Sequence, residues 1–307
     1  MKRVMSGLNR SGLLHVEFKN GTFYLHNFQT KKHKPKIKLF FRNLFRDREI
    51  DFEGSIKFME DEHCYIEGTN GFGHVIPKDT LNETTIFSWA ISGSLPETLH
   101  SVKLLPAYNI LLGKSSLFSL DHNETPYREK IDKCIYRFGI CIPERLKLVE
   151  LSKKNSEIMD CKYKYSDKYL DLVINCEPGE RRALKNWLKR KKADNYLRVS
   201  EMLKYKVQVE MYGWESFLWK LKSNCLVLKW KTMNEYTLLD NFFKPDVHYI
   251  LVDENDIVDK ITFYMKEENH HLVEDMIQSR KKVFNEILSN ETIFRDYGIN
   301  AIKEYLH

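Results

Sequence analysis

A glycine between a predicted strand and a predicted helix is a feature that could bind a ligand. Residues 205–212 alternate apolar and polar side chains as a strand does, Gly213 follows, and residues 214–222 have apolar side chains at helical spacing. At such a turn the unpaired N–H groups and the dipole of the helix favour an anion. Ser216 could add a hydroxyl, and Lys220 or Lys222 a positive charge. The segment therefore predicts a phosphate or diphosphate site, although a glycine at a strand end most often only makes a turn.

Further strands and helices are needed to position this turn. Residues 225–228 and 247–252 form short apolar runs typical of buried strands, and a helical pattern follows through residues 273–287. Upstream, residues 134–136 are typical of a buried strand, and Pro143 begins a predicted helix. Strand, helix and strand in this order predict βαβ units of a parallel sheet, in which ligands bind at the carboxyl ends of the strands.

Two blocks of the chain carry motifs of a known family. The first contains the glycine turn, a strand start at Ser223-Asn224-Cys225, and the strand Pro245-Asp246-Val247-His248-Tyr249-Ile250. The second contains Arg137-Phe138-Gly139, Pro143-Glu144-Arg145 and Met159-Asp160. These blocks resemble glycosyltransferase family 90, which includes bacterial lipopolysaccharide and capsule transferases and the protein O-glucosyltransferases. The likeness covers roughly residues 86–287, and Cys225 stands where the family usually has a serine.

The resemblance implies an α/β fold of the GT-B type, with two Rossmann-like domains facing across a cleft. We expect an acceptor-side domain over residues 1–125, a nucleotide-sugar-binding domain over 126–285, and a C-terminal helix in 286–307 that packs back on the first domain. It also implies inverting transfer of glucose, xylose or a similar sugar from a UDP-sugar to a glycan or glycolipid acceptor, in lipopolysaccharide, capsule or glycoprotein-glycan synthesis. No metal and no further cofactor are expected, and the chain has no Asp-x-Asp triplet of the kind that holds Mg²⁺ against a diphosphate.

The expected donor-binding residues follow from the matched motifs. They are Arg137, Gly139, Arg145, Gly213, Ser216, Trp219, Ser223, Asn224, Glu235 and His248. Arg137 and Arg145 would balance the charge of UDP, since guanidinium groups match phosphate oxygens, but structural ion pairs are the alternative. Glu235 would contact a ribose hydroxyl or be a surface residue, and His248 would shape the donor cleft or be a hydrogen-bonded core histidine. Trp219 is more typical of a core than of a sugar platform.

The catalytic base is the point at which the chain departs from the family. Ser94 stands where the family has a carboxylate, and a serine cannot accept the acceptor's proton unaided. Glu97 and Asp121 are the nearest carboxylates that could replace it, and each could equally be a solvated loop residue. The alternative function is therefore a catalytically impaired protein of the same fold that binds a nucleotide sugar or a glycan.

Composition and charge narrow the remaining function classes. The chain has 307 residues, of which 42% are hydrophobic and 13% aromatic, so it can form real cores. Its formal charge of +6, from 49 basic and 43 acidic residues, is too small an excess to indicate nucleic acid. The six cysteines form no C-x-x-C pair, which favours reduced structural thiols.

The segment Lys31–Arg48 has basic residues interleaved with apolar residues at helical spacing. This pattern allows a peripheral membrane contact, whereas a solvated basic face above ordinary core contacts is the alternative. The first ten residues lack the apolar region of a secretory signal, and no apolar run is long enough to cross a bilayer. We therefore expect a cytoplasmic protein, with possible contact at the inner face of a membrane.

Overall fold

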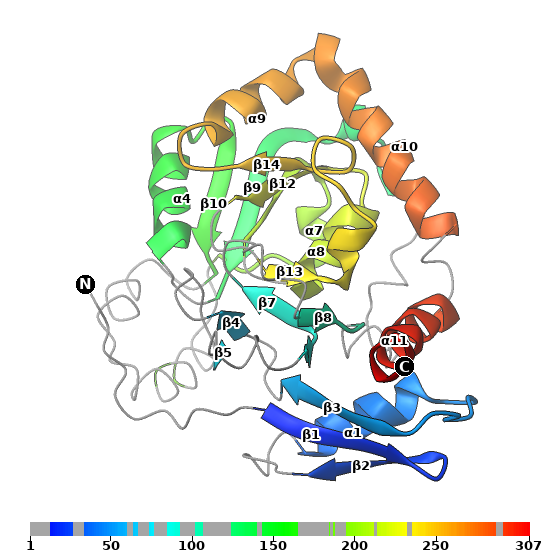
Figure 1. The fold of residues 1–307 in the computed structure, drawn as a ribbon. Helices are drawn as coiled ribbons and strands as arrows, with labels where there is room; N and C mark the ends of the chain where they lie inside the picture. Colours follow the sequence, from blue (N-terminus) through cyan, green and yellow to red (C-terminus); the bar gives the residue numbers. More distant parts are fainter. Residues whose placement is uncertain are drawn as a thin grey trace.

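The computed structural model of the chain describes most of its helices and strands. The described residues are 13–26, 34–59, 64–66, 74–76, 85–92, 102–106, 124–139, 143–164, 184, 187, 195–211, 214–231, 235–286 and 291–307. They form a mixed α/β fold built on two five-stranded sheets (Figure 1). The α/β class predicted from the sequence is confirmed, while the GT-B arrangement and the domain boundaries stay predictions.

The N-terminal half contains a mixed sheet in the order β2-β1-β3-β6-β8. Its strands are β1 (Leu13–Lys19), β2 (Thr22–His26), β3 (Gly54–Met59), β6 (Ile86–Ser88) and β8 (Val102–Leu104). The first three pair antiparallel, and β3, β6 and β8 run parallel. Asn20 and Gly21 both have positive φ, 50° and 69°, which suits the two-residue turn of the β1–β2 hairpin.

Two helices from opposite ends of the chain cover this sheet. Helix α1 (Lys34–Leu44) buries Ile37, Phe40 and Phe41 completely, so its apolar face packs into the core and its basic residues remain at the surface. Helix α11 (Glu291–Leu306) lies against α1 and β3 (Figure 1). A Cβ placed on Gly298 would come within 2.9 Å of Leu44 Cδ1, which shows how closely the two helices approach.

The C-terminal half contains an all-parallel sheet in the order β10-β9-β11-β12-β14. Its strands are β9 (Ile131–Phe138), β10 (Met159–Tyr163), β11 (Tyr205–Glu210), β12 (Leu226–Trp230) and β14 (Ile250–Val252). Numbered along the chain, this order is 2-1-3-4-5, that of a doubly wound sheet. Its central strands β11 and β12 are almost entirely buried because helices cover both faces of the sheet.

The helices of this half are α4 (Pro143–Lys154), α7 (Val199–Met202), α8 (Trp214–Lys222), α9 (Ile257–Met265) and α10 (His270–Glu286). Short 3-10 turns lie at η2 (Tyr127–Glu129), η4 (Leu238–Asn241) and η5 (Glu267–Asn269). On one face of the sheet, Leu226 and Leu228 pack with residues of α4, α9 and α10. On the other, Val227 packs with α8 in a cluster that continues into the core of the N-terminal sheet.

Two short sheets complete the described part of the chain. Strand β7 (Ala90–Ser92) pairs antiparallel with β13 (Glu235–Thr237), so a segment that begins five residues after β12 is hydrogen-bonded to the N-terminal half. Strands β4 (Cys64–Ile66) and β5 (His74–Ile76) pair with each other. The carboxyl end of β12 therefore leads directly toward the N-terminal half (Figure 1).

The predicted β11–α8–β12 unit and the helix that begins at Pro143 are confirmed. The predicted strand over 247–252 is shorter, because residues 245–249 form a turn in which Asp246 has a φ of 60°. Helix α9 was not predicted. Among the described helices, none combines the length and the apolar character that a membrane span requires.

Candidate functional site

The point where the strand order reverses lies between β9 and β11. Helix α4, which follows β9, leads to β10 on one side, while β11 continues the sheet on the other side. The β9–β11 pairing ends at Ile135 and Gln208, whereas β11 stays paired with β12 as far as Glu210. Strand β9 likewise stays paired with β10 as far as Phe138. Strands β9 and β11 thus stop pairing with each other before their carboxyl ends. Doubly wound sheets bind ligands at this position.

Three side chains donate hydrogen bonds to the backbone carbonyls at the end of β11. Lys220 Nζ donates to Val209 O at 2.7 Å. The Tyr136 hydroxyl and Arg145 Nη2 both donate to Met211 O, at 2.9 Å and 2.7 Å. The Arg145 guanidinium also lies 5.8 Å from the ring centre of Tyr136. Polar and aromatic side chains of β9, α4 and α8 therefore line the end of β11, because the adjacent backbone no longer satisfies these carbonyls.

A buried ion pair lies beside these contacts. Lys220 Nζ and Ser216 Oγ each donate to Glu210 Oε2 at 2.6 Å. Glu210 and Lys220 are 3% and 2% exposed. Burial lowers the pKa of Lys220, and the adjacent Glu210 carboxylate opposes that shift. Ser216 thus lies at the predicted edge of the sheet, where its described partners are Glu210 and Lys220.

Gly139 and Lys164 meet at the ends of β9 and β10. The Lys164 N–H donates to Phe138 O at 3.0 Å, which places Lys164 beside the end of β9. A Cβ on Gly139 would lie 2.9 Å from Lys164 Cε and 3.0 Å from its Nζ. The absence of a side chain at residue 139 therefore leaves room for the end of the Lys164 side chain beside the end of β9.

Arg137 has a structural ion pair, which is the alternative that the sequence left open. Its Nη2 donates to Asp160 Oδ2 at 2.6 Å, and its Nε donates to Asn195 O at 2.9 Å. Burial acts to raise the pKa of Asp160, but hydrogen bonds from Lys162 and Arg137 outweigh it and lower that pKa. Arg137 is 7% exposed in its side chain and lies inside the protein beside the reversal point.

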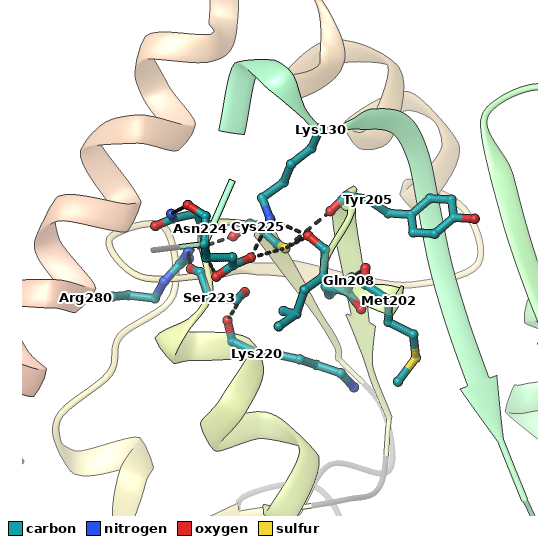
Figure 2. Close-up of polar contacts among 11 residues, drawn as sticks. Lys130, Met202, Tyr205, Gln208, Lys220, Ser223, Asn224, Cys225 and Arg280 are labelled. Atoms are coloured by element: carbon teal, nitrogen blue, oxygen red, sulfur yellow. Dashed lines mark hydrogen bonds and ion pairs between the residues drawn. The ribbon is translucent and has the colours of Figure 1, made fainter. Parts of the chain in front are cut away.

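Ser223 and Asn224 lie at the opposite, amino-terminal edge of the sheet, because they directly precede β12. The Asn224 N–H donates to Glu124 Oε2 at 2.8 Å, and the Ser223 hydroxyl donates to Lys220 O at 2.6 Å. Figure 2 shows this network together with Lys130 and Cys225, with the Lys220 ammonium pointing away from it. These two predicted donor-binding residues therefore belong to a buried network of interior contacts.

His248 lies at the same edge, just before β14. Its Nδ1 accepts from the Lys244 N–H at 2.8 Å, and burial together with Arg280 lowers its pKa. Arg280 of α10 donates to the carbonyls of His248, Ser223 and Cys225 at 2.7, 3.0 and 2.6 Å. Burial lowers the pKa of Arg280 to about 10. Arg280 thus connects three of the segments that precede or cover the amino ends of the strands (Figure 2).

Trp219 is 7% exposed and packs with Leu203 and Cys225, as a core residue would. Glu235 lies in β13 opposite Ser92 of β7. Gly213, Ser94, Glu97 and Asp121 lie outside the described residues. Within the described part of the chain, no group of three His, Cys, Asp or Glu side chains is arranged to hold a metal ion.

The structure thus divides the predicted residues between the two edges of the parallel sheet. Gly139, Arg145 and Ser216 come together near the reversal point, with Arg137 beside them, while Ser223, Asn224 and His248 lie at the far edge. Sequence reasoning did not single out Tyr136, Lys164 or Glu210. Their common signal is position, since each stands at or near the last residue of a strand.

Comparison with known proteins adds no relative. No protein-family model matches this sequence, and no curated protein matches it.

Proposed function

We propose that this chain is a glycosyltransferase that binds a UDP-sugar at the carboxyl edge of the parallel sheet and transfers the sugar to a glycan or glycolipid. The observation that carries the proposal is the reversal point, where Arg145 reaches from α4 to the end of β11 and the end of the Lys164 side chain lies beside Gly139. Doubly wound sheets bind nucleotides at this position. The family motifs at Gly139, Arg145 and Gly213 supply the second, independent support.

The chemistry at this edge suits a diphosphate leaving group. Transfer from a UDP-sugar breaks the bond between the anomeric carbon and the diphosphate oxygen, so negative charge develops on UDP. Cationic donors stabilise such charge when they are already in place. Arg145 of α4 lies at the end of β11, Lys164 directly follows β10, and Lys220 pairs with Glu210. In the proposed reaction Arg145 and Lys164 bind the diphosphate, and no metal ion is required.

The acceptor would approach from the N-terminal half, as in a GT-B enzyme. Strand β13 leads from the carboxyl end of β12 and pairs with β7, which ends two residues before Ser94. The family's base position thus follows a strand that is linked to the proposed donor edge. Because Ser94 is not a carboxylate, Glu97 or Asp121 would have to accept the acceptor's proton. Without such a base, the protein would bind the nucleotide sugar and not transfer it.

A thermal-shift panel of nucleotides tests donor binding. UDP-sugars and UDP should raise the melting temperature more than ADP- and GDP-sugars do. At a ligand concentration a hundredfold above Kd, the expected stabilisation is about 2.7 kcal/mol. No shift with any uridine nucleotide at millimolar concentration would end the proposal.

Release of UDP in the presence of acceptor glycans then separates the two functions. Catalytic release supports a transferase. Binding without release supports the impaired protein, which Ser94 suggests.

A further inference from the structure

One oxygen of the Glu210 carboxylate has no donor. Oε2 accepts from Lys220 and Ser216, but among the residues that the structure describes nothing donates a hydrogen bond to Oε1. Glu210 is 97% buried, so water does not solvate this oxygen as it would at the surface. A buried acceptor that lacks a donor costs free energy, and such groups persist mainly where they have a task.

Glu210 lies at the proposed donor edge. It is the last residue of β11, and its carboxylate is close enough to Tyr136 to raise the pKa of that phenol, to which burial contributes most. Tyr136 in turn contacts Arg145. The unpaired oxygen therefore belongs to the same group of side chains as the guanidinium that we assign to the diphosphate.

The electrostatics of the pair select the kind of group that Oε1 could bind. A phosphate would be repelled by the carboxylate. A second cation would give the neutral, buried pair of Glu210 and Lys220 a net positive charge, and an unbalanced buried charge is costly. A neutral donor meets neither obstacle. Sugar hydroxyls are the neutral donors that a nucleotide sugar carries in greatest number, and carboxylates at the ends of doubly wound strands bind ribose hydroxyls in dinucleotide enzymes.

We infer that Glu210 Oε1 accepts a hydrogen bond from a sugar hydroxyl of the bound nucleotide sugar, either on the ribose or on the transferred sugar. The inference rests on the proposed function and adds a specificity-determining residue to it. Lys220 and Ser216 hold the carboxylate in place through Oε2, so Oε1 is fixed before the ligand arrives. Preorganised acceptors of this kind discriminate strongly against analogues that lack the hydroxyl.

The test is calorimetric titration of the wild-type protein with UDP, 2′-deoxy-UDP, 3′-deoxy-UDP and UDP-glucose. If the ribose provides the donor, one deoxy analogue should bind about tenfold or more weakly than UDP, the loss expected of a hydrogen bond to a charged group. If the transferred sugar provides it, both deoxy analogues should bind like UDP, and UDP-glucose should bind about tenfold more tightly than UDP.

The variant Glu210→Gln assigns the effect to this carboxylate. In this variant the tenfold difference should shrink to within about threefold, because the hydrogen bond loses its charge. Glu150→Gln, an exposed carboxylate on α4, is the matched control and should behave as wild type. Glu210→Asp, which keeps the charge and withdraws the oxygen by one methylene, gives the same readout if the glutamine variant does not fold.

Two outcomes overturn the inference alone. One is binding of all four ligands with equal affinity to the wild-type protein. The other is a hydroxyl preference that Glu210→Gln and Glu210→Asp leave unchanged, as expected if a water molecule fills the site. Failure of every uridine nucleotide to bind the wild-type protein is a different result, which refutes the proposed function and this inference together.

Discussion

Replacing Gly139 by alanine tests the proposed diphosphate site because it moves one cation, the Lys164 ammonium, without removing it. The new Cβ would lie 2.9 Å from Lys164 Cε and 3.0 Å from Nζ, whereas carbon atoms in contact are about 3.5–4.0 Å apart. The Lys164 side chain must therefore shift by about 0.5–1 Å at its end. A lysine end is flexible, and no positive φ at residue 139 opposes alanine, so the stability should change by less than about 1 kcal/mol.

The effect on a ligand should be larger than the effect on stability. A hydrogen bond to a charged group contributes about 1.5–3 kcal/mol, which corresponds to about 10–150-fold in Kd. Lys164→Met removes the whole interaction, and we expect it to weaken UDP binding by about tenfold or more. Gly139→Ala displaces the ammonium and removes part of the interaction, so about three- to tenfold is expected.

Calorimetric titration of UDP measures these changes, and urea denaturation measures stability in the same samples. Because both substitutions act through one ammonium, Gly139→Ala should have no further effect on Kd in the Lys164→Met background. Two results would refute the reasoning. One is a folded Gly139→Ala protein that binds UDP as tightly as wild type, and the other is losses that add in the double variant.

Three further predictions concern stability. Arg280→Met leaves three buried carbonyls, in the two segments before β12 and β14, without this donor, and we expect a loss of about 3–5 kcal/mol in urea denaturation; a loss below about 1 kcal/mol would show that Arg280 does not hold these segments. Gly298→Ala should cost about 1–2 kcal/mol of stability although alanine favours helices. The new Cβ would lie 2.9 Å from Pro106 Cδ, and a proline ring cannot move away as a flexible side chain can. A stabilised variant would contradict this packing. Burial acts to raise the pKa of Asp256, but hydrogen bonds from Lys231, the Asp253 backbone and Lys260 lower it to about 2. The carboxylate therefore stabilises the fold at pH values above its unfolded pKa of 3.8, and this stabilisation is lost as the pH falls through about 2. Asp256→Asn should therefore cost about 1 kcal/mol at pH 7, after allowing for solvent screening, and nothing below about pH 2; a difference that is constant over this range would refute the assignment.

Local patterns predicted the elements around the glycine turn because each reflects one short stretch of chain. Strand β11 alternates apolar and polar residues, helix α8 repeats every three to four residues, and β12 begins with the apolar run Leu226–Leu228. Such patterns identify the type of element. They did not show that the polar residues of β11, Lys206, Gln208 and Glu210, are buried as well. The short strand β14 was overestimated because the turn at Asp246 depends on a backbone angle that no periodicity reports.

The order of the strands was not available from periodicity. Pairing of β9 with β10 joins residues 25 positions apart, such as Cys134 and Met159, and its pairing with β11 joins residues 73 positions apart, such as Cys134 and Val207. Only this order places Arg145 beside Met211 and Tyr136 beside Lys220. Site residues that meet across the reversal point, Glu210 and Lys164 among them, therefore required the structure.

The predicted donor-binding residues at the amino edge of the parallel sheet show what a sequence motif leaves undetermined. Ser223 and Asn224 precede β12 and His248 precedes β14, so a parallel sheet places all three at the end opposite to the reversal point. The positions of Ser223 and Asn224 at the start of a strand were visible in the sequence, whereas His248 was predicted within the strand over 247–252. The motifs that resemble glycosyltransferase family 90 and contain these residues lie at two strands, and each strand reaches both edges of the sheet. A resemblance to a motif can therefore identify a strand. The direction of that strand in the sheet is also needed, because it decides which residues lie at the carboxyl edge, where ligands bind, and which lie at the amino edge.

The most direct test of the account is calorimetric titration of UDP into the wild-type protein, Arg145→Met and Lys147→Met. Arg145 lies at the end of β11, whereas Lys147, two residues further along α4, pairs with Glu254 at the surface. We predict one UDP site per chain, weakened about tenfold or more by Arg145→Met and unchanged by Lys147→Met. The absence of UDP binding to the wild-type protein, or equal effects of the two substitutions, would contradict a nucleotide site at the ends of β9 and β11.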